Sequence, residues 1–231
     1  MKLFQRIQAF GVLLPAAMLI CGVAASGAGL GSGNDKDNDK DKAKDAKAET
    51  RKVETRNNAA SLLADLVGSD KDVSKILIIK HNSKELGELM KSISDTAGDD
   101  SKKLEAMAKS DPSLNLKAMQ LPPGEAATRA AVSKTKEHEL LSSSGETFEL
   151  NLLLTQTEAL NYGSHLAKVA AENSSSEAEQ RDFNAMSTSL DQLYQKVVAA
   201  IRTMPRGNEE HSSKEEKKGK SDKPQEAKPP Q

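Results

Sequence analysis

The chain has 231 residues, of which 36% are hydrophobic and 29% are charged, and its formal net charge is −1 at pH 7. A charge this close to zero predicts no overall field that would attract nucleic acid or an anionic membrane surface. Aromatic residues make up only 3% of the chain and tryptophan is absent, which argues against stacking platforms for single-stranded nucleic acid. We therefore expect no nucleic-acid partner.

Residues 1–28 have the pattern of a secretory signal peptide. Lys2 and Arg6 precede a mostly apolar run that ends near Ala25, and further small residues follow. This pattern predicts cleavage and export to the periplasm or beyond, with an uncleaved signal anchor as the alternative. The one cysteine, Cys21, does not follow a small residue as a lipoprotein signal requires, so no lipid anchor is expected. No later segment is apolar enough to span a bilayer, so the mature chain is expected to lack an integral membrane span.

Two charged segments are predicted to lie outside the folded domain. Residues 29–47 form a low-complexity linker of alternating acidic and basic residues, and residues 205–231 form a polar, proline-rich tail. Neither segment has the apolar residues needed to build a core, so both are expected to be disordered. Asp35, Asp37 and Asp39 have the spacing of a calcium loop, but Lys40 stands where such a loop needs glycine.

Residues 48–204 are predicted to form one all-α domain, a bundle of about four main helices plus a short one. The expected helices are Glu49–Val67, Lys71–Ala97, the short Asp99–Ser110, a helix opened by Pro122 and Pro123 and ending near Leu141, Glu146–Glu172, and a last helix ending at Met204. Gly98 is expected to end the second helix. Ser143 with Glu146, and Ser176 with Glu179, have the spacing of capping boxes that start the last two helices.

Helix 146–172 has the clearest pattern in the chain. Its apolar stripe is Phe148, Leu152, Thr155, Ala159, Tyr162, Leu166 and Val169, widened by Leu153, Leu160 and Ala167. A stripe this wide needs more than one neighbour, which favours a bundle over a two-stranded coiled coil. Gly163 is interpreted as a position where another helix approaches closely.

Two pairs of side chains are the candidate metal ligands, and no catalytic residues or cofactor are predicted. Glu158 and His165 share a polar seam of the long helix, but they are two turns apart, about 10 Å by helix rise. His81 and Glu85 are one turn apart and could hold an ion weakly. No Glu-x-x-His motif of the kind found in di-iron bundles occurs around the histidines. A solvated polar edge explains both pairs without a metal.

The segment from Leu121 to Phe183, with Gly145, Phe148 and Glu149 as a Gly-x-x-Phe-(Asp/Glu) element before a long helix, resembles the bacterial domain of unknown function 4142. The resemblance extends over roughly residues 53–204. It implies a ferritin-like helical bundle and export, and it carries no established biochemical activity. Many members of that family place a histidine near the position of Leu160, whereas this chain has His165 later, which weakens the metal-site interpretation.

Three functional hypotheses follow from the sequence. The first is an exported, non-enzymatic bundle that acts through its surfaces, in envelope maintenance or stress tolerance, because no catalytic constellation is found. The second is a ferritin-like metal-binding protein that uses the candidate ligands above. The third is an oligomeric scaffold, with a second copy of the chain or an envelope protein as partner.

Overall fold

The computed structural model describes residues 37–78, 80 and 82–204, and it confirms the all-α fold. The described elements are α2 (Asp37–Asp70), a 3₁₀-helix η1 (Val73–Ile78), α3 (Lys84–Ser110), α4 (Pro123–Ser142), α5 (Gly145–Glu172) and α6 (Glu177–Thr203). No strand occurs among these residues. The predicted signal peptide, the first part of the linker and the predicted tail lie outside the described residues.

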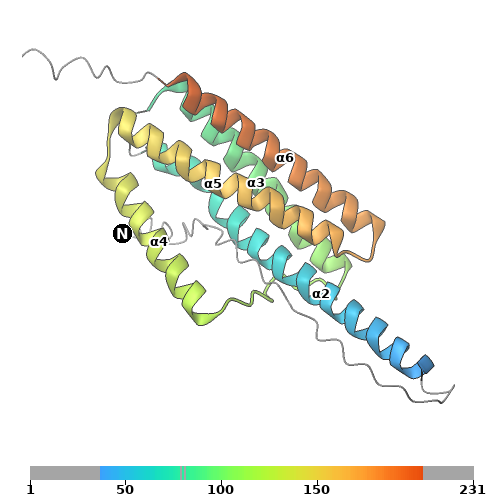
Figure 1. Cartoon of the computed structure of the whole chain (residues 1–231). Coiled ribbons are helices and arrows are strands. Elements are labelled where there is room, and N and C mark those ends of the chain that lie inside the picture. Colours follow the sequence, from blue (N-terminus) through green and yellow to red (C-terminus); the bar gives the residue numbers. More distant parts are fainter. Residues whose placement is uncertain (1–36, 79, 81, 205–231) are drawn as a thin grey trace, which may run out of the picture.

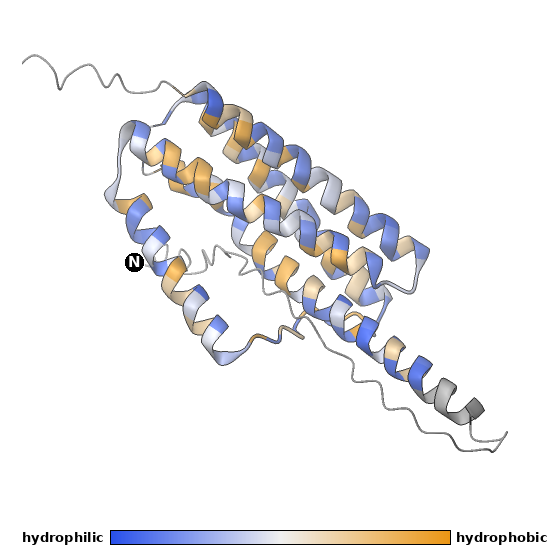
Figure 2. Ribbon diagram, in the orientation of Figure 1, coloured by the Kyte–Doolittle hydropathy of each residue, from blue (hydrophilic) through white to orange (hydrophobic). Residues whose placement is uncertain are grey.

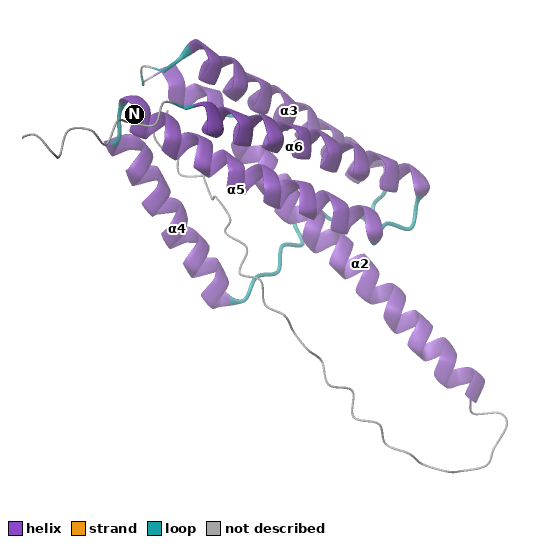
Figure 3. Cartoon of the chain, turned by 45° about the horizontal axis from the view of Figure 1, so that its top comes forward, coloured by secondary structure: helices purple, strands orange, loops and turns teal. Residues whose placement is uncertain are grey.

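Four helices, α2, α3, α5 and α6, form the bundle (Figure 1). Helix α5 packs against α6 and α2, and α3 packs against α2 and α6, so the four helices surround one core. Neighbouring helices run antiparallel (Figures 1 and 3). No helix in the described part of the chain has the length and apolar character needed to cross a membrane.

One long connection, residues 111–144, joins α3 to α5 and contains α4. Helix α4 packs against α5 on the outside of the bundle, and among its side chains only Leu140 is buried. Pro123 stands at its first position, as the sequence predicts, because proline lacks the N–H that the first turn leaves unpaired. The bundle thus consists of two helical hairpins, α2–α3 and α5–α6, joined by one long crossover connection.

Helix α5 provides the largest share of the core, as its pattern predicts (Figure 2). Phe148, Leu152 and Ala159 of the predicted stripe are buried, whereas Val169 at its end is exposed. A Cβ on Gly163 would lie 2.7 Å from Leu66 Cδ2 and 3.2 Å from Leu190 Cδ1. The packing interpretation of this glycine is therefore confirmed, since the absent side chain lets α2 and α6 approach α5.

Helix α2 begins at Asp37, twelve residues before the expected start at Glu49, so residues 37–47 are helical rather than a linker. This part of α2 projects beyond the other helices, and its described side chains from residue 44 to residue 52 are exposed (Figures 1 and 3). A linker was predicted here because the segment has no apolar face. It is helical because lysine has good helix propensity and because the segment extends a helix that packing has already nucleated.

Two of the predicted helix boundaries are wrong, namely the start of the helix Lys71–Ala97 and the break between it and the short helix Asp99–Ser110. The first part of the predicted helix is the short 3₁₀-helix η1, where Ile78 is 83% exposed, and α3 starts only at Lys84. Helix α3 then continues through Gly98 to Ser110. Its buried face stays in phase on both sides of the glycine, at Ala97 and Leu104, and this burial outweighs the cost of about 1 kcal/mol for glycine in a helix.

The two predicted capping boxes have different outcomes. The Ser176 hydroxyl accepts a hydrogen bond from the backbone N–H of Glu179, which confirms the start of α6. At α5 the N-cap is Ser144, whose side chain makes no capping bond, while the Ser143 hydroxyl donates to the carbonyl of Leu140. The capping box between Ser143 and Glu146 is therefore wrong.

Candidate functional site

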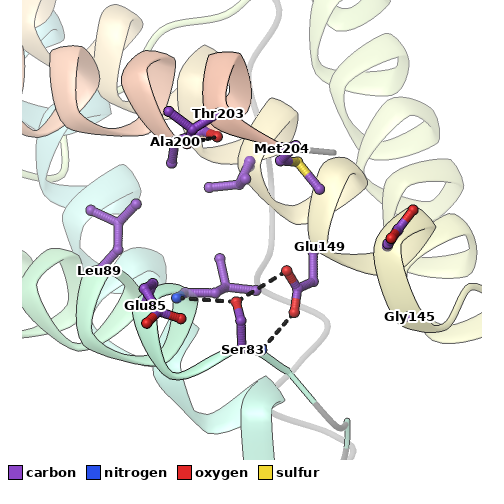
Figure 4. A pocket seen from close by; sticks show the side chains of 11 residues that line it. Ser83, Glu85, Leu89, Gly145, Glu149, Ala200, Thr203 and Met204 are labelled. Atoms are coloured by element: carbon purple, nitrogen blue, oxygen red, sulfur yellow. Dashed lines mark hydrogen bonds between the residues drawn. The ribbon is translucent and has the colours of Figure 1, made fainter. Parts of the chain in front are cut away.

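A pocket of about 500 Å³ lies where α3 and α5 begin and α6 ends (Figure 4). This volume is within the usual range for small-molecule sites. The described lining consists of the apolar residues Leu86, Leu89, Leu153, Ala200 and Met204 and of Ser83, Glu85, Gly145, Glu146, Glu149 and Thr203. The pocket thus combines an apolar wall with three carboxylates and has no lysine or arginine among its described lining residues.

Glu149 connects α5 to the start of α3. Its carboxylate accepts hydrogen bonds from the backbone N–H of Ser83 at 2.6 Å and from the Ser83 hydroxyl at 3.1 Å. The same hydroxyl accepts from the backbone N–H of Leu86 and so caps α3. A carboxylate beside a helix N-terminus is favoured by the partial positive charge there. These bonds hold one side of the pocket in place (Figure 4).

A short turn joins α4 to α5 beside the pocket. Gly145 has a φ of +56°, a left-handed conformation that residues with a Cβ adopt only at a cost. Lys80 holds the other side of this turn, because its ammonium donates to the carbonyls of Leu141 at 2.7 Å and Ser143 at 2.8 Å. It also lies 5.7 Å from the centre of the Phe148 ring. Its charge is therefore used at the end of α4.

Glu85 and Glu146 are the two exposed carboxylates of the pocket. Each lies in the first turn of its helix, Glu85 in α3 and Glu146 in α5. Neither one forms an ion pair or a side-chain hydrogen bond with any other residue that the structure describes. Two of the three carboxylates are consequently available to a ligand.

The predicted metal ligands Glu158 and His165 do not converge. Glu158 is half-buried and faces α4, where Lys136 Nζ lies 3.4 Å from its Oε1. His165 is exposed, and its Nδ1 lies 2.8 Å from the carbonyl oxygen of Asn161, one turn earlier in the same helix. Glu158 thus contributes to the packing of α4 against α5, whereas His165 contacts solvent.

Of the second pair, Glu85 lies at the pocket and His81 lies outside the described residues, so this pair stays a prediction. Among the residues that the structure describes, no three histidine, cysteine, aspartate or glutamate side chains come close enough together to hold a metal ion. Glu85, Glu146 and Glu149 of the pocket are included in this statement.

At the opposite end of the bundle, Arg56 is a buried charge that sequence reasoning missed. Its side chain is 1% exposed, and its Nη1 lies 3.1 Å from Asp111 Oδ2 and 3.0 Å from Glu179 Oε2. A hydrogen bond from Ser113 lowers the pKa of Asp111, whereas burial raises the pKa of Glu179. The sequence could have indicated this buried ion pair, because Arg56 and Glu179 occupy positions on the apolar stripes of α2 and α6.

A second buried polar pair lies in the core between α2 and α5. Asp70 is 4% exposed, and burial raises its pKa to about 7, while the neighbouring amide of Gln156 lowers it. Gln156 is fully buried, and neither of its amide atoms reaches good hydrogen-bond geometry with a partner. The carboxyl of Asp70 is therefore held in the core without a cation, which disfavours its charged form.

Comparison of the chain with family models, with curated proteins and with solved structures finds no match. The resemblance to the domain of unknown function 4142 therefore stays a prediction.

Proposed function

We propose that this chain is an exported protein that acts by binding a small molecule, rather than by catalysis, in the pocket between α3, α5 and α6. The pattern of residues 1–28 supports export. The pocket supports binding, because its volume suits a small molecule and its wall combines apolar side chains with a few polar groups.

One observation carries the binding proposal, namely that the pocket is held in shape by the protein itself. The bonds from Ser83 to Glu149 join α3 to α5, and Lys80 fixes the turn before α5. A site that is already ordered loses less conformational entropy when a ligand binds. The Ser83 hydroxyl is used in these bonds, and the described lining contains no histidine or cysteine that would act as a base or nucleophile.

Export is tested by expressing the full chain in a bacterial host and measuring the mass of the product in the envelope fraction. We expect a chain shortened by about 28 residues, the length of the predicted signal. The variant Leu14→Arg places a charge in the apolar run and should leave the full-length chain in the cytoplasm. A wild-type chain that stays full-length inside the cell would contradict export.

Binding is tested by thermal unfolding of the purified chain in the presence of aliphatic amines, carboxylates and alcohols. We expect at least one class to raise the unfolding midpoint, since a ligand that binds only the folded state stabilises it. Ala200→Trp fills the pocket and should abolish the rise. Ala199→Trp is the matched control, because Ala199 is the exposed neighbour on α6 and should leave the rise intact. No rise with any class would contradict the proposal.

A further inference from the structure

We propose that Glu179 and Asp111 share one proton beside Arg56, so that this ion cluster acts as a pH-dependent latch between the crossover connection, α2 and α6. The three side chains come from different parts of the fold and meet at one nitrogen atom. Arg56 Nη1 lies 3.1 Å from Asp111 Oδ2 and 3.0 Å from Glu179 Oε2. Two acidic groups are therefore held together at a single, fully buried guanidinium group.

The guanidinium of Arg56 does not neutralise both carboxylates. Its other donors are used elsewhere, because Nη2 donates to the Ser113 hydroxyl at 2.9 Å and Nε donates to the side-chain oxygen of Asn57 at 3.4 Å. One positive charge between two ionised carboxylates leaves a buried negative charge uncompensated, which is costly. One proton on the pair makes the cluster neutral, which is the usual outcome where two carboxyl groups lie side by side.

The surroundings of the two carboxyl groups show which one holds the proton. Asp111 accepts hydrogen bonds from the backbone N–H and the hydroxyl of Ser113, each at 2.8 Å, and these bonds favour its charged form. Glu179 is 8% exposed, and its Oε1 is buried with no hydrogen-bond partner among the described residues. Burial raises the pKa of Glu179, and a hydrogen bond that its protonated form donates to Asp111 raises it further, so the proton belongs to Glu179.

The charges that surround Glu179 do not replace this proton. Arg56 of α2 lowers the pKa of Glu179, and the N-terminus of α6 also favours a carboxylate there, but Arg56 is shared with Asp111 of the crossover connection. Lys103 of α3 lies 4.0 Å from Asp182, nearly one turn further along α6. Arg56 and Asp111 are therefore the charged groups that face Glu179 in the described part of the chain.

The cluster lies where three parts of the fold meet, so its protonation affects how they are joined. Asp111 directly follows α3, and Glu179 lies in the first turn of α6. Ser113 is bound by α2 twice, because Asn57 donates to its carbonyl at 2.9 Å and Arg56 donates to its hydroxyl. When Glu179 loses its proton, the two carboxylates repel each other beside Arg56, which weakens the attachment of residues 111–115 to α2.

The pH range of the latch follows from the two pKa shifts. Burial raises the pKa of Glu179 from 4.5, so its contribution to stability is complete below pH 4.5 and is lost as the pH rises through the folded-state pKa. The hydrogen bond from Ser113 lowers the pKa of Asp111 from 3.8, so its contribution is complete above pH 3.8 and is lost in stronger acid. The latch is therefore tightest in mild acid.

The test is a pH titration of the purified full chain, labelled with ¹³C at its side-chain carboxyl carbons and followed by NMR. We expect the midpoint of Glu179 to lie above pH 4.5 and that of Asp111 to lie below pH 3.8. Asp111→Asn removes the second carboxylate, so the midpoint of Glu179 should move to lower pH, because Arg56 then acts on Glu179 alone. Asp95→Asn is the matched control, since Asp95 is an exposed residue of α3 that pairs with Lys91, and it should leave the midpoint unchanged.

Glu179→Gln imitates the neutral carboxyl and gives a second measurement. Its stability in urea, relative to the wild type, should rise with pH across the Glu179 titration. Above that midpoint, the backbone amides of residues 111–115 should exchange hydrogen more slowly in the variant than in the wild type.

Each outcome bears on one part of the proposal. A Glu179 midpoint at or below pH 4.5, or one that Asp111→Asn leaves in place, would overturn the shared proton. Because the wild-type titration needs no variant, this result stands even where Glu179→Gln is poorly folded. A stability difference that is the same at every pH, or equal hydrogen exchange of residues 111–115 in the two proteins, would overturn the latch.

Discussion

Carboxylates from different elements lie at both ends of the bundle, but among the described residues only one end has a buried cation paired with them. Arg56 lies between Asp111 and Glu179 at one end, where its side chain is 1% exposed. At the other end Glu85 and Glu146 line a pocket and have no ion-pair partner among the residues that the structure describes. The comparison suggests that the first end serves stability and that the second is available for binding.

The largest expected effect on stability is at the end of the bundle that contains Arg56. Arg56→Met removes the shared cation and leaves Asp111 and Glu179 facing each other, so the free energy of unfolding should fall by about 3–5 kcal/mol. Urea unfolding at neutral pH measures the change. Arg51→Met is the control, because Arg51 is an exposed residue of the projecting part of α2. Equal stabilities of the two variants would show that the buried ion cluster contributes little.

The second prediction concerns the carboxyl that lies in the core between the two ends. Burial raises the pKa of Asp70 from 3.8 to about 7, so between these values the folded state binds one more proton than the unfolded state. Stability contributed by this group is therefore present below pH 3.8 and is lost as the pH rises towards 7.

Asp70→Asn removes this titration, and its amide can donate to Gln156 Oε1, which has no partner. At pH 8 the variant should exceed the wild type by about 2–4 kcal/mol, and the difference should vanish near pH 4. Unfolding by urea at several pH values measures it. Because other titrating groups are common to both proteins, they cancel in the difference. A difference that is independent of pH would refute this assignment.

A third, smaller effect is expected where three helices meet. Gly163→Val places a side chain against Leu66 and Leu190 and should cost about 1–3 kcal/mol through overpacking. Gly98→Val is the matched control, because a Cβ at Gly98 meets no atom within 4 Å. The same change of helix propensity occurs at both sites, so the difference between the two variants isolates the packing term. Equal costs would indicate that α2 and α6 move apart freely.

The smallest effect on stability is expected at the pocket. The double variant Glu85→Gln, Glu146→Gln should change the free energy of unfolding by less than about 0.5 kcal/mol, because both side chains are exposed and unpaired. Urea unfolding measures this change beside that of Arg56→Met. A loss comparable to that of the arginine variant would mean that the pocket carboxylates are structural, which removes the contrast between the two ends.

Much of the fold could be predicted because its signals are local. Most of the stripe of α5 and the N-cap at Ser176 depend on residues three and four positions apart, and the structure confirms both. The pocket could not be predicted, because its lining comes from α3, α5 and α6 and its carboxylates look like ordinary first-turn residues. The metal candidates were chosen by spacing within one helix, which does not determine whether the side chains converge.

Local sequence patterns were enough to predict the helical class, the start of α4 at Pro123 and the close approach at Gly163, because steric and hydrogen-bonding constraints act over one or two turns. Packing between helices, in contrast, makes α3 continue through Gly98 and buries Arg56 between two carboxylates. The same folding brings Glu85 of α3 and Glu146 of α5 to the lining of one pocket. These features depend on packing between distant segments, whose free energy exceeds the local preferences.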